Sequence, residues 1–133
     1  FHEMEKRGLV PMESTLVSVL SACSQSGSLD VGRRIHEYYI KQKRVQSSVI
    51  LANALIDMYG KCGSMDEAGE LFHKMPERDL VSWNSVIVGC ASHGLAKKAL
   101  DLFELMKRSR LKPDSITFVG ILSACAHGGS HKG

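Results

Sequence analysis

The chain has 133 residues and a formal net charge of +3, and 44% of its residues are hydrophobic. This apolar content suffices for a continuous helical core in a single domain and is too high for a disordered chain. The mild positive charge permits a polyanionic partner without demanding one. No segment approaches the roughly 18 consecutive apolar residues of a membrane helix.

The N-terminal part of the chain predicts three helices. Their apolar spacing places them at about residues 1–7, 13–24 and 29–43. Gly8 ends the first helix, and Pro11 prevents it from continuing. Gly32 lies inside the third helix, where glycine costs roughly 1 kcal/mol relative to alanine. We therefore expect the pair of helices at 13–24 and 29–43 to be the least stable part of the chain.

The central part of the chain contains one pattern twice: an apolar helix, a glycine turn and a second apolar helix. The helices are predicted at about residues 49–61, 65–75, 81–92 and 95–109. Gly63 and Gly94 close the first helix of each copy, and Ser64 with Glu67 has the sequence of a capping box. Apolar residues recur at i, i+3, i+4 and i+7, the spacing of one helix face, at Ala52, Leu55, Ile56 and Tyr59 and again at Trp83, Val86, Ile87 and Cys90.

The same pattern extends towards both ends of the chain. A last helix is expected at residues 115–126, and Gly27 and Gly129 follow their helices at the offset of Gly63 and Gly94. The intervals between these glycines are 36, 31 and 35 residues, so the repeat length alternates. Repeats of this length indicate stacked supersecondary units. The predicted fold is an all-α solenoid in which antiparallel helix pairs form a superhelix, with a concave face built mainly from the first helices.

Three stretches of sequence resemble a known family: NALIDMYGKCGSMDEA, MPERDLVSWNSVI and FVGILSACAHGG. They are similar to pentatricopeptide repeat proteins of the plant subtype that interleaves long, short and standard repeats. The 34-residue tetratricopeptide pattern is excluded, because its W-x2-L-G-x2-Y signature is absent after Trp83. The resemblance covers the whole chain and divides it into a partial repeat (1–12), a long repeat (13–48), a short repeat (49–79), a standard repeat (80–114) and a partial long repeat (115–133). Partial repeats at both ends lead us to expect an exposed apolar end, self-association or marginal stability.

The resemblance implies binding of single-stranded RNA with one base read per repeat. In the family, the fifth residue of a repeat reads the base together with the last. The short repeat offers Asn53 with Asp79, and the standard repeat offers Asn84 with Asp114; the family's code assigns both pairs to uracil. An amide can accept a hydrogen bond from the N3–H of uracil and donate to its carbonyl oxygens. A carboxylate can fix the orientation of the amide directly or through water.

The remaining contacts that the resemblance implies are less uniform. The long repeat offers Val17 with Ser48, and Val17 has no hydrogen-bonding group, so we assign this base no identity. Lys61 corresponds to a phosphate-contacting lysine. The second residue of each repeat packs against base faces in the family; here these residues are Ile50, Val81 and Ile116, with Ser14 as a weaker wall.

Each of these assignments has a structural alternative. Asp79 and Asp114 precede helices, where aspartate is a good N-cap, and capping can coexist with base reading. Val81 and Ile116 have core packing as their alternative. Trp83 and Phe118 lie in the apolar stripes and are expected in the core rather than as stacking platforms.

The sequence gives little support for a metal, a cofactor or catalysis. The four cysteines form no C-x2-C pair and are interpreted as small buried thiols in a reducing compartment. Cys125, His127 and His131 form a C-x-H-x3-H motif that we interpret as incidental, so no metal site is predicted. The H-x-E and P-C-x-x-C motifs of an editing deaminase are absent, and the chain is expected to be a binding module rather than an enzyme.

The leading hypothesis is therefore sequence-selective RNA binding, within a plant RNA-editing or RNA-processing factor of the mitochondrion or chloroplast. RNA in such arrays runs 5′ to 3′ along the N-to-C direction, which predicts N-U-U for the three complete repeats. No transit peptide is visible in the sequence. The alternative hypothesis is a scaffold that binds accessory editing-factor proteins through the long repeats, around Val17 and Ser21.

Overall fold

The computed structural model describes residues 13–41 and 48–130, with side chains described up to residue 126. The regular elements of this part are all helical, as expected for an all-α solenoid: α2 (Glu13–Ser26), α3 (Leu29–Ile35), the π-helix η1 (His36–Lys41), α4 (Val49–Lys61), α5 (Met65–Lys74), α6 (Leu80–Ser92), α7 (Ala96–Lys107) and α8 (Ser115–Ser130). The helix expected at residues 1–7, the partial repeat 1–12 and His131 lie outside the described residues. None of the described helices is both long and apolar enough to span a membrane.

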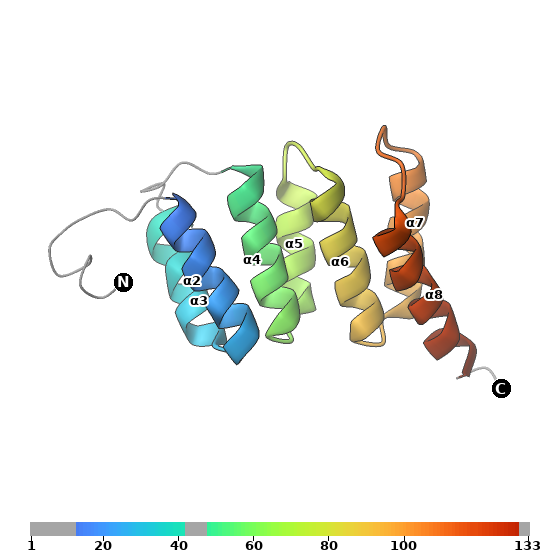
Figure 1. The fold of residues 1–133 in the computed structure, drawn as a ribbon, viewed down its shortest axis with the longest axis horizontal. Coiled ribbons are helices and arrows are strands. Elements are labelled where there is room, and N and C mark those ends of the chain that lie inside the picture. Colours follow the sequence, from blue (N-terminus) through green and yellow to red (C-terminus); the bar gives the residue numbers. More distant parts are fainter. Residues whose placement is uncertain (1–12, 42–47, 131–133) are drawn as a thin grey trace, which may run out of the picture.

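The helices form two layers, one of first helices and one of second helices (Figure 1). In the first layer α2 packs on α4, α4 on α6, and α6 on α8. The second helices α3, α5 and α7 lie behind, each packed on the first helix of its own pair and on that of the next. This arrangement confirms the predicted stack of helix pairs, and it places equivalent residues of α4, α6 and α8 side by side.

The glycine turns between paired helices are alike in geometry. Gly27, Gly63 and Gly94 have φ of 71°, 88° and 74°, a left-handed conformation that glycine adopts without the penalty of a Cβ. The following residue closes each turn with the six-to-one hydrogen bond of a helix C-terminus: Ser28 N to Cys23 O at 3.0 Å, Ser64 N to Tyr59 O at 2.7 Å, and Leu95 N to Cys90 O at 2.8 Å. The turn expected at Gly129 is not formed, since α8 continues to Ser130.

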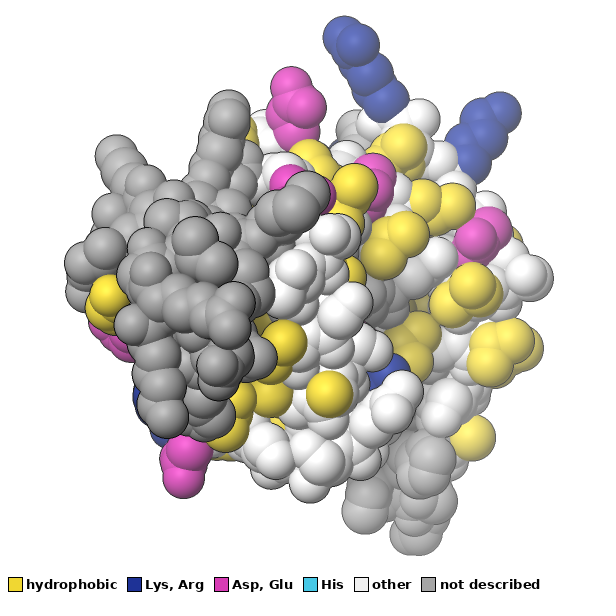
Figure 2. Space-filling model, turned by 60° about the vertical axis from the view of Figure 1, so that its left-hand side comes forward, with side chains coloured by type: hydrophobic (Ala, Val, Ile, Leu, Met, Phe, Trp, Pro, Cys, Tyr) yellow, Lys and Arg dark blue, Asp and Glu magenta, His cyan; other side chains and the backbone are white. Residues whose placement is uncertain are grey.

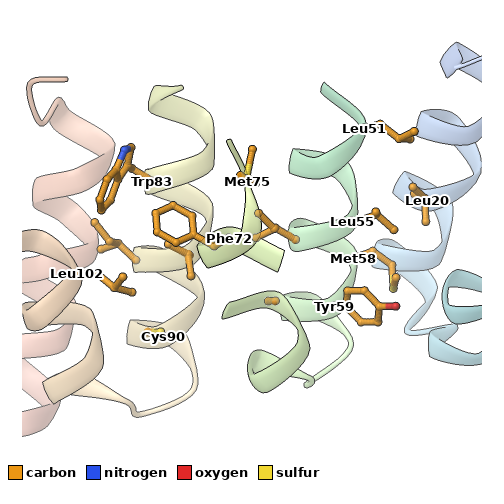
Figure 3. Close-up of a cluster of buried hydrophobic side chains, with 14 of the residues drawn as sticks. Leu20, Leu51, Leu55, Met58, Tyr59, Phe72, Met75, Trp83, Cys90 and Leu102 are labelled. Carbon is orange, nitrogen blue, oxygen red and sulfur yellow. The ribbon is translucent and has the colours of Figure 1, made fainter. Parts of the chain in front are cut away.

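A continuous apolar core runs along the junction of the two layers (Figure 3). Leu55, Tyr59 and Phe72 are at most 1% exposed. The rings of Phe72 and Trp83 meet edge to face at 4.8 Å between centroids, which joins α5 to α6. Trp83 is 3% exposed, and its expected core position is confirmed. Burying each large side chain of this cluster contributes roughly 1.5–3 kcal/mol.

The apolar stripe of α8 is less buried than predicted. Phe118, expected in the core, is 48% exposed and touches Phe103 with 5.8 Å between ring centroids. Cys125 is exposed and Cys62 is only partly buried, whereas Cys23 and Cys90 are buried as expected. Phe118 and Cys125 are exposed because α8 has described neighbours, α6 and α7, on only one side.

The long repeat departs from the regular pattern in its second helix. The helix predicted from residue 29 is α-helical only to Ile35 and continues as a π-helix to Lys41. Gly32 is buried against α4, where a Cβ would overlap the end of the Met58 side chain, so any larger residue there would require the flexible Met58 side chain to move.

Several polar contacts join the long repeat to the short one; among them, the Cys62 thiol donates to the Cys23 carbonyl at 3.5 Å. Arg33 of α3 pairs with Glu67 of α5, and the Ser64 hydroxyl donates to the same carboxylate at 2.8 Å. The capping box predicted for Ser64 and Glu67 is therefore wrong, because Glu67 faces Arg33 instead of the backbone and Ser64 makes no side-chain cap. His36 Nδ1 lies 2.7 Å from the Tyr59 hydroxyl, and burial, with a smaller effect of Lys41, lowers the pKa of His36.

Candidate nucleic-acid interface

The N-termini of α6 and α8 are capped by an aspartate and by a hydroxyl residue three positions later. Asp79 Oδ1 accepts from the Ser82 backbone N–H at 3.0 Å, and the Asp79 N–H donates to Ser82 Oγ at 3.1 Å. Asp114 and Thr117 repeat both hydrogen bonds at 3.1 Å. These reciprocal bonds satisfy backbone groups that the start of a helix leaves without partners. The capping considered as an alternative for both aspartates is therefore present.

An asparagine from the preceding first helix contacts each capping aspartate. Asn53 Nδ2 in α4 donates to Asp79 Oδ1 at 3.0 Å, and Asn84 Nδ2 in α6 donates to Asp114 Oδ1 at the same distance. The asparagines are 8% and 7% exposed, because neighbouring first helices pack over them. The structure thus brings together the two residue pairs that the family resemblance assigns to base reading. Each pair lies where two repeats meet.

Two hydroxyls that the sequence patterns did not single out complete these pairs. Ser82 Oγ donates to Asn53 Oδ1 at 2.6 Å, and Thr117 Oγ1 donates to Asn84 Oδ1. Both hydroxyl residues are fully buried. The signal that could have found them is D-x-x-[ST] at 79–82 and 114–117, since this capping spacing places the hydroxyl beside the carboxylate.

The hydrogen bonds keep both carboxylates ionised. Burial raises the pKa of Asp79, but the Ser82 backbone N–H, the Asn53 amide and the Ser82 hydroxyl together bring it below its ordinary value. The Thr117 backbone N–H is the main cause of the lowered pKa of Asp114; burial opposes it, and the Asn84 amide adds to it. Hydrogen bonds to the charged form favour that form. At neutral pH both carboxylates are therefore pure acceptors that orient the amides.

Exposed aliphatic side chains stand beside the amides. Ile50, Val81 and Ile116 are 61%, 56% and 56% exposed, so the core packing considered for Val81 and Ile116 does not occur. A hollow of about 530 Å³ lies between α4, α6 and α8, and Val81, Asn84 and Ile116 are among its lining residues. A polar edge between two exposed apolar side chains can hold a flat ring by its faces and read its edge.

Positive charge on this surface is sparse. Lys61 lines the same hollow, but its Nζ lies 3.3 Å from the Asp57 carboxylate one turn earlier on α4. Both side chains reach solvent, so this ion pair is weak and can exchange with a phosphate. Figure 2, an oblique view from the N-terminal side, shows scattered Lys and Arg side chains, together with Asp and Glu side chains, on a surface that is mostly apolar or uncharged.

The long repeat has no equivalent of the amide–carboxylate pair. Val17 is partly buried and has no polar group. Ser48 Oγ accepts from the Leu51 backbone N–H at 3.1 Å, so this last residue of the repeat caps α4. Elsewhere in the described part, no three His, Cys, Asp or Glu side chains are grouped as metal ligands.

Stacked helix pairs, with the same polar site recurring in the short and standard repeats, define an α-solenoid binding protein. Models of the pentatricopeptide repeat match three stretches: the repeat domain at residues 1–62, the repeat at 50–80 and the repeat family at 78–127. The chain belongs to the pentatricopeptide repeat family, whose repeats are binding modules and not enzymes.

Relatives in Arabidopsis thaliana are similar over almost the whole chain. The chloroplastic pentatricopeptide repeat-containing protein At1g08070 is 45% identical over 97% of the chain, and the mitochondrial At1g77170 is 44% identical over 97%. The chain spans 18% and 28% of the length of these two proteins.

Solved structures of one family member share the fold. The crystal structure of maize PPR10 matches 99% of the chain with a TM-score of 0.84 and 26% identity. PPR10 in complex with an 18-nt psaJ RNA element matches 95% with a TM-score of 0.75 and 27% identity. The chain covers 19% of each of these structures.

Proposed function

We propose that this chain binds single-stranded RNA and reads one base per repeat, as the recognition part of a plant RNA-editing or RNA-processing factor with alternating repeat lengths. The observation that carries the proposal is the same Asn–Asp contact in consecutive repeats; at the second of them, exposed Val81 and Ile116 line the same hollow as Asn84. The structure of PPR10 in complex with an RNA element supports RNA as the partner. The mitochondrial and chloroplastic relatives support a location in one of these organelles.

The chemistry of the two sites fits uracil. Each asparagine amide retains one N–H and one oxygen lone pair after bonding its aspartate and hydroxyl partners. The oxygen can accept the N3–H of uracil while the N–H donates to a uracil carbonyl. Ile50 and Val81 would flank the base of the short repeat, and Val81 and Ile116 that of the standard repeat. With the RNA running 5′ to 3′ along the chain, the complete repeats select N-U-U.

The expected affinity is low because only two bases are read. A base stacked between side chains contributes about 1–3 kcal/mol, and Lys61 is the one phosphate contact that we assign. Few phosphate contacts also predict a shallow dependence of affinity on salt concentration. This combination distinguishes base reading from non-specific attraction to a polyanion.

The test is fluorescence anisotropy with short oligonucleotides carrying two adjacent uridines in an adenosine background, with each uridine replaced in turn. Wild type should prefer uridine at both positions. The Asn84→Thr variant should shift the preference from U towards G at the second position and leave the first, read by Asn53, unchanged. Equal binding to every oligonucleotide would contradict the proposal.

A second candidate is a scaffold for accessory editing-factor proteins. The observation that favours it is the long repeat, where Val17 replaces a reading amide and exposed Ser14 and Ser21 flank it on α2. If wild type binds none of the oligonucleotides but an accessory protein co-purifies with it and is lost in Val17→Lys, the scaffold replaces RNA binding as the proposed function.

A further inference from the structure

Each Asn–Asp pair has a third member, supplied by the first helix of the following repeat. Ser82 on α6 bonds the amide oxygen of Asn53, and Thr117 on α8 bonds that of Asn84. Neither hydroxyl residue has any exposed surface. Neither can touch a base, so any effect on recognition must act through the amide.

The two ends of an amide are distinguishable to a base. Uracil presents the O4 acceptor next to the N3–H donor, whereas cytosine presents the N4–H donor next to the N3 acceptor. An amide with its nitrogen opposite O4 and its oxygen opposite N3–H therefore pairs with uracil. The same amide rotated by 180° about its terminal bond pairs with cytosine. The orientation of the asparagine amide thus decides between the two pyrimidines.

The groups around each amide favour one orientation. The carboxylate only accepts, so it takes the amide N–H. Each hydroxyl already accepts the N–H of its aspartate at 3.1 Å, which directs its own proton towards the amide oxygen and the carboxylate. Rotation would place the amide oxygen against the carboxylate and the NH2 group against a hydroxyl whose acceptor capacity is partly used.

We propose that Ser82 and Thr117 are positioning residues that set the selectivity for uracil over cytosine in the repeat before their own. This inference rests on the proposed RNA-binding function. The recognition unit is then three residues, the third of which belongs to the next repeat, and exchanging a neighbouring repeat would change the selectivity of the one before it.

The long repeat provides an internal comparison. Its fifth residue is Val17, and the residue equivalent to the two hydroxyls is Leu51, which is fully buried. Ser48 there accepts from the Leu51 backbone N–H. The hydroxyl is therefore present in both repeats whose fifth residue is an amide that needs orienting, and it is absent where that residue is apolar.

The test measures the ratio of affinities for U and C at each of the two positions, using oligonucleotides that differ at one base. Ser82→Ala should lower the ratio about fivefold at the first base, the equivalent of one hydrogen bond, and leave the second base unchanged. Thr117→Val should do the reverse. Ser82→Thr and Thr117→Ser retain the hydroxyl and should keep the wild-type ratios.

Because each variant keeps one reader intact, discrimination at the other base reports that the protein is folded. An unchanged ratio at the variant's own base would overturn the inference while leaving RNA reading in place. A loss of discrimination between U and C at both bases together would also overturn the inference, because the hydroxyl would then have a general structural role. If wild type itself does not distinguish U from C, the proposed function fails first and the inference fails with it.

Discussion

Replacing Asp79 with alanine removes three hydrogen bonds that the structure assigns to one carboxylate oxygen; the one from the Ser82 hydroxyl is shared with the Asn53 amide oxygen. Oδ1 caps α6 through the Ser82 N–H and holds the Asn53 amide. Loss of an N-cap costs about 1 kcal/mol. The amide N–H of Asn53, which is 8% exposed, loses a partner for about 1 kcal/mol more. We expect Asp79→Ala to lower the free energy of unfolding by about 2 kcal/mol.

The measurement is urea unfolding followed by circular dichroism at neutral pH, where the carboxylate is ionised. Glu77→Ala is the matched control, because Glu77 is exposed, carries the same charge and lies two residues away. Its effect should stay within about 0.5 kcal/mol, as for most surface substitutions. Equal losses in the two variants would show that Asp79 acts only through its charge, and the described hydrogen-bond network would be refuted.

Three further substitutions test other parts of the account. His36→Gln should flatten the pH dependence of urea unfolding below about pH 6.5: burial lowers the pKa of His36, so the unfolded chain binds the proton first and wild-type stability falls as the pH drops through that value. Gly94→Ala should destabilise the folded protein by about 1 kcal/mol, because Gly94 has a φ of 74°. The control Gly69→Ala, inside α5 with open space at its Cβ, should instead stabilise it by about 0.5–1 kcal/mol. Equal effects of the two variants in thermal melts would contradict the turn geometry. Leu122→Lys removes an apolar side chain that is 69% exposed on α8, and sedimentation should show weaker self-association than in wild type.

The periodic features of the chain could be predicted from its sequence. The spacing of apolar residues located the helices of the short repeat at 49–61 and 65–75, and the structure has Val49–Lys61 and Met65–Lys74. Gly63 and Gly94 marked turns because their left-handed conformation excludes most other residues. The pairing of Asn53 with Asp79 followed from the repeat positions of the family, because these positions carry information on contacts between residues distant in sequence.

The features that escaped prediction depend on tertiary surroundings. Phe118 has the spacing of a core residue but lies on a helix with described neighbours on one side only. Glu67 has the spacing of a capping box, yet Arg33 from another repeat competes for its carboxylate. The role of Ser82 requires knowing that α4 and α6 bring Asn53 and Asp79 to the same hydroxyl, which a pattern within one helix does not contain.

The central claim is that the amides of Asn53 and Asn84 meet the bases. The most direct measurement is a titration of 15N-labelled protein with a two-uridine oligonucleotide, following the side-chain NH2 resonances of both asparagines. The account predicts that both pairs of resonances shift with the uridine oligonucleotide and that the Asn84 pair stays in place when the second uridine is replaced by adenosine. RNA-induced shifts confined to the second-helix layer, with both amides unmoved, would contradict it.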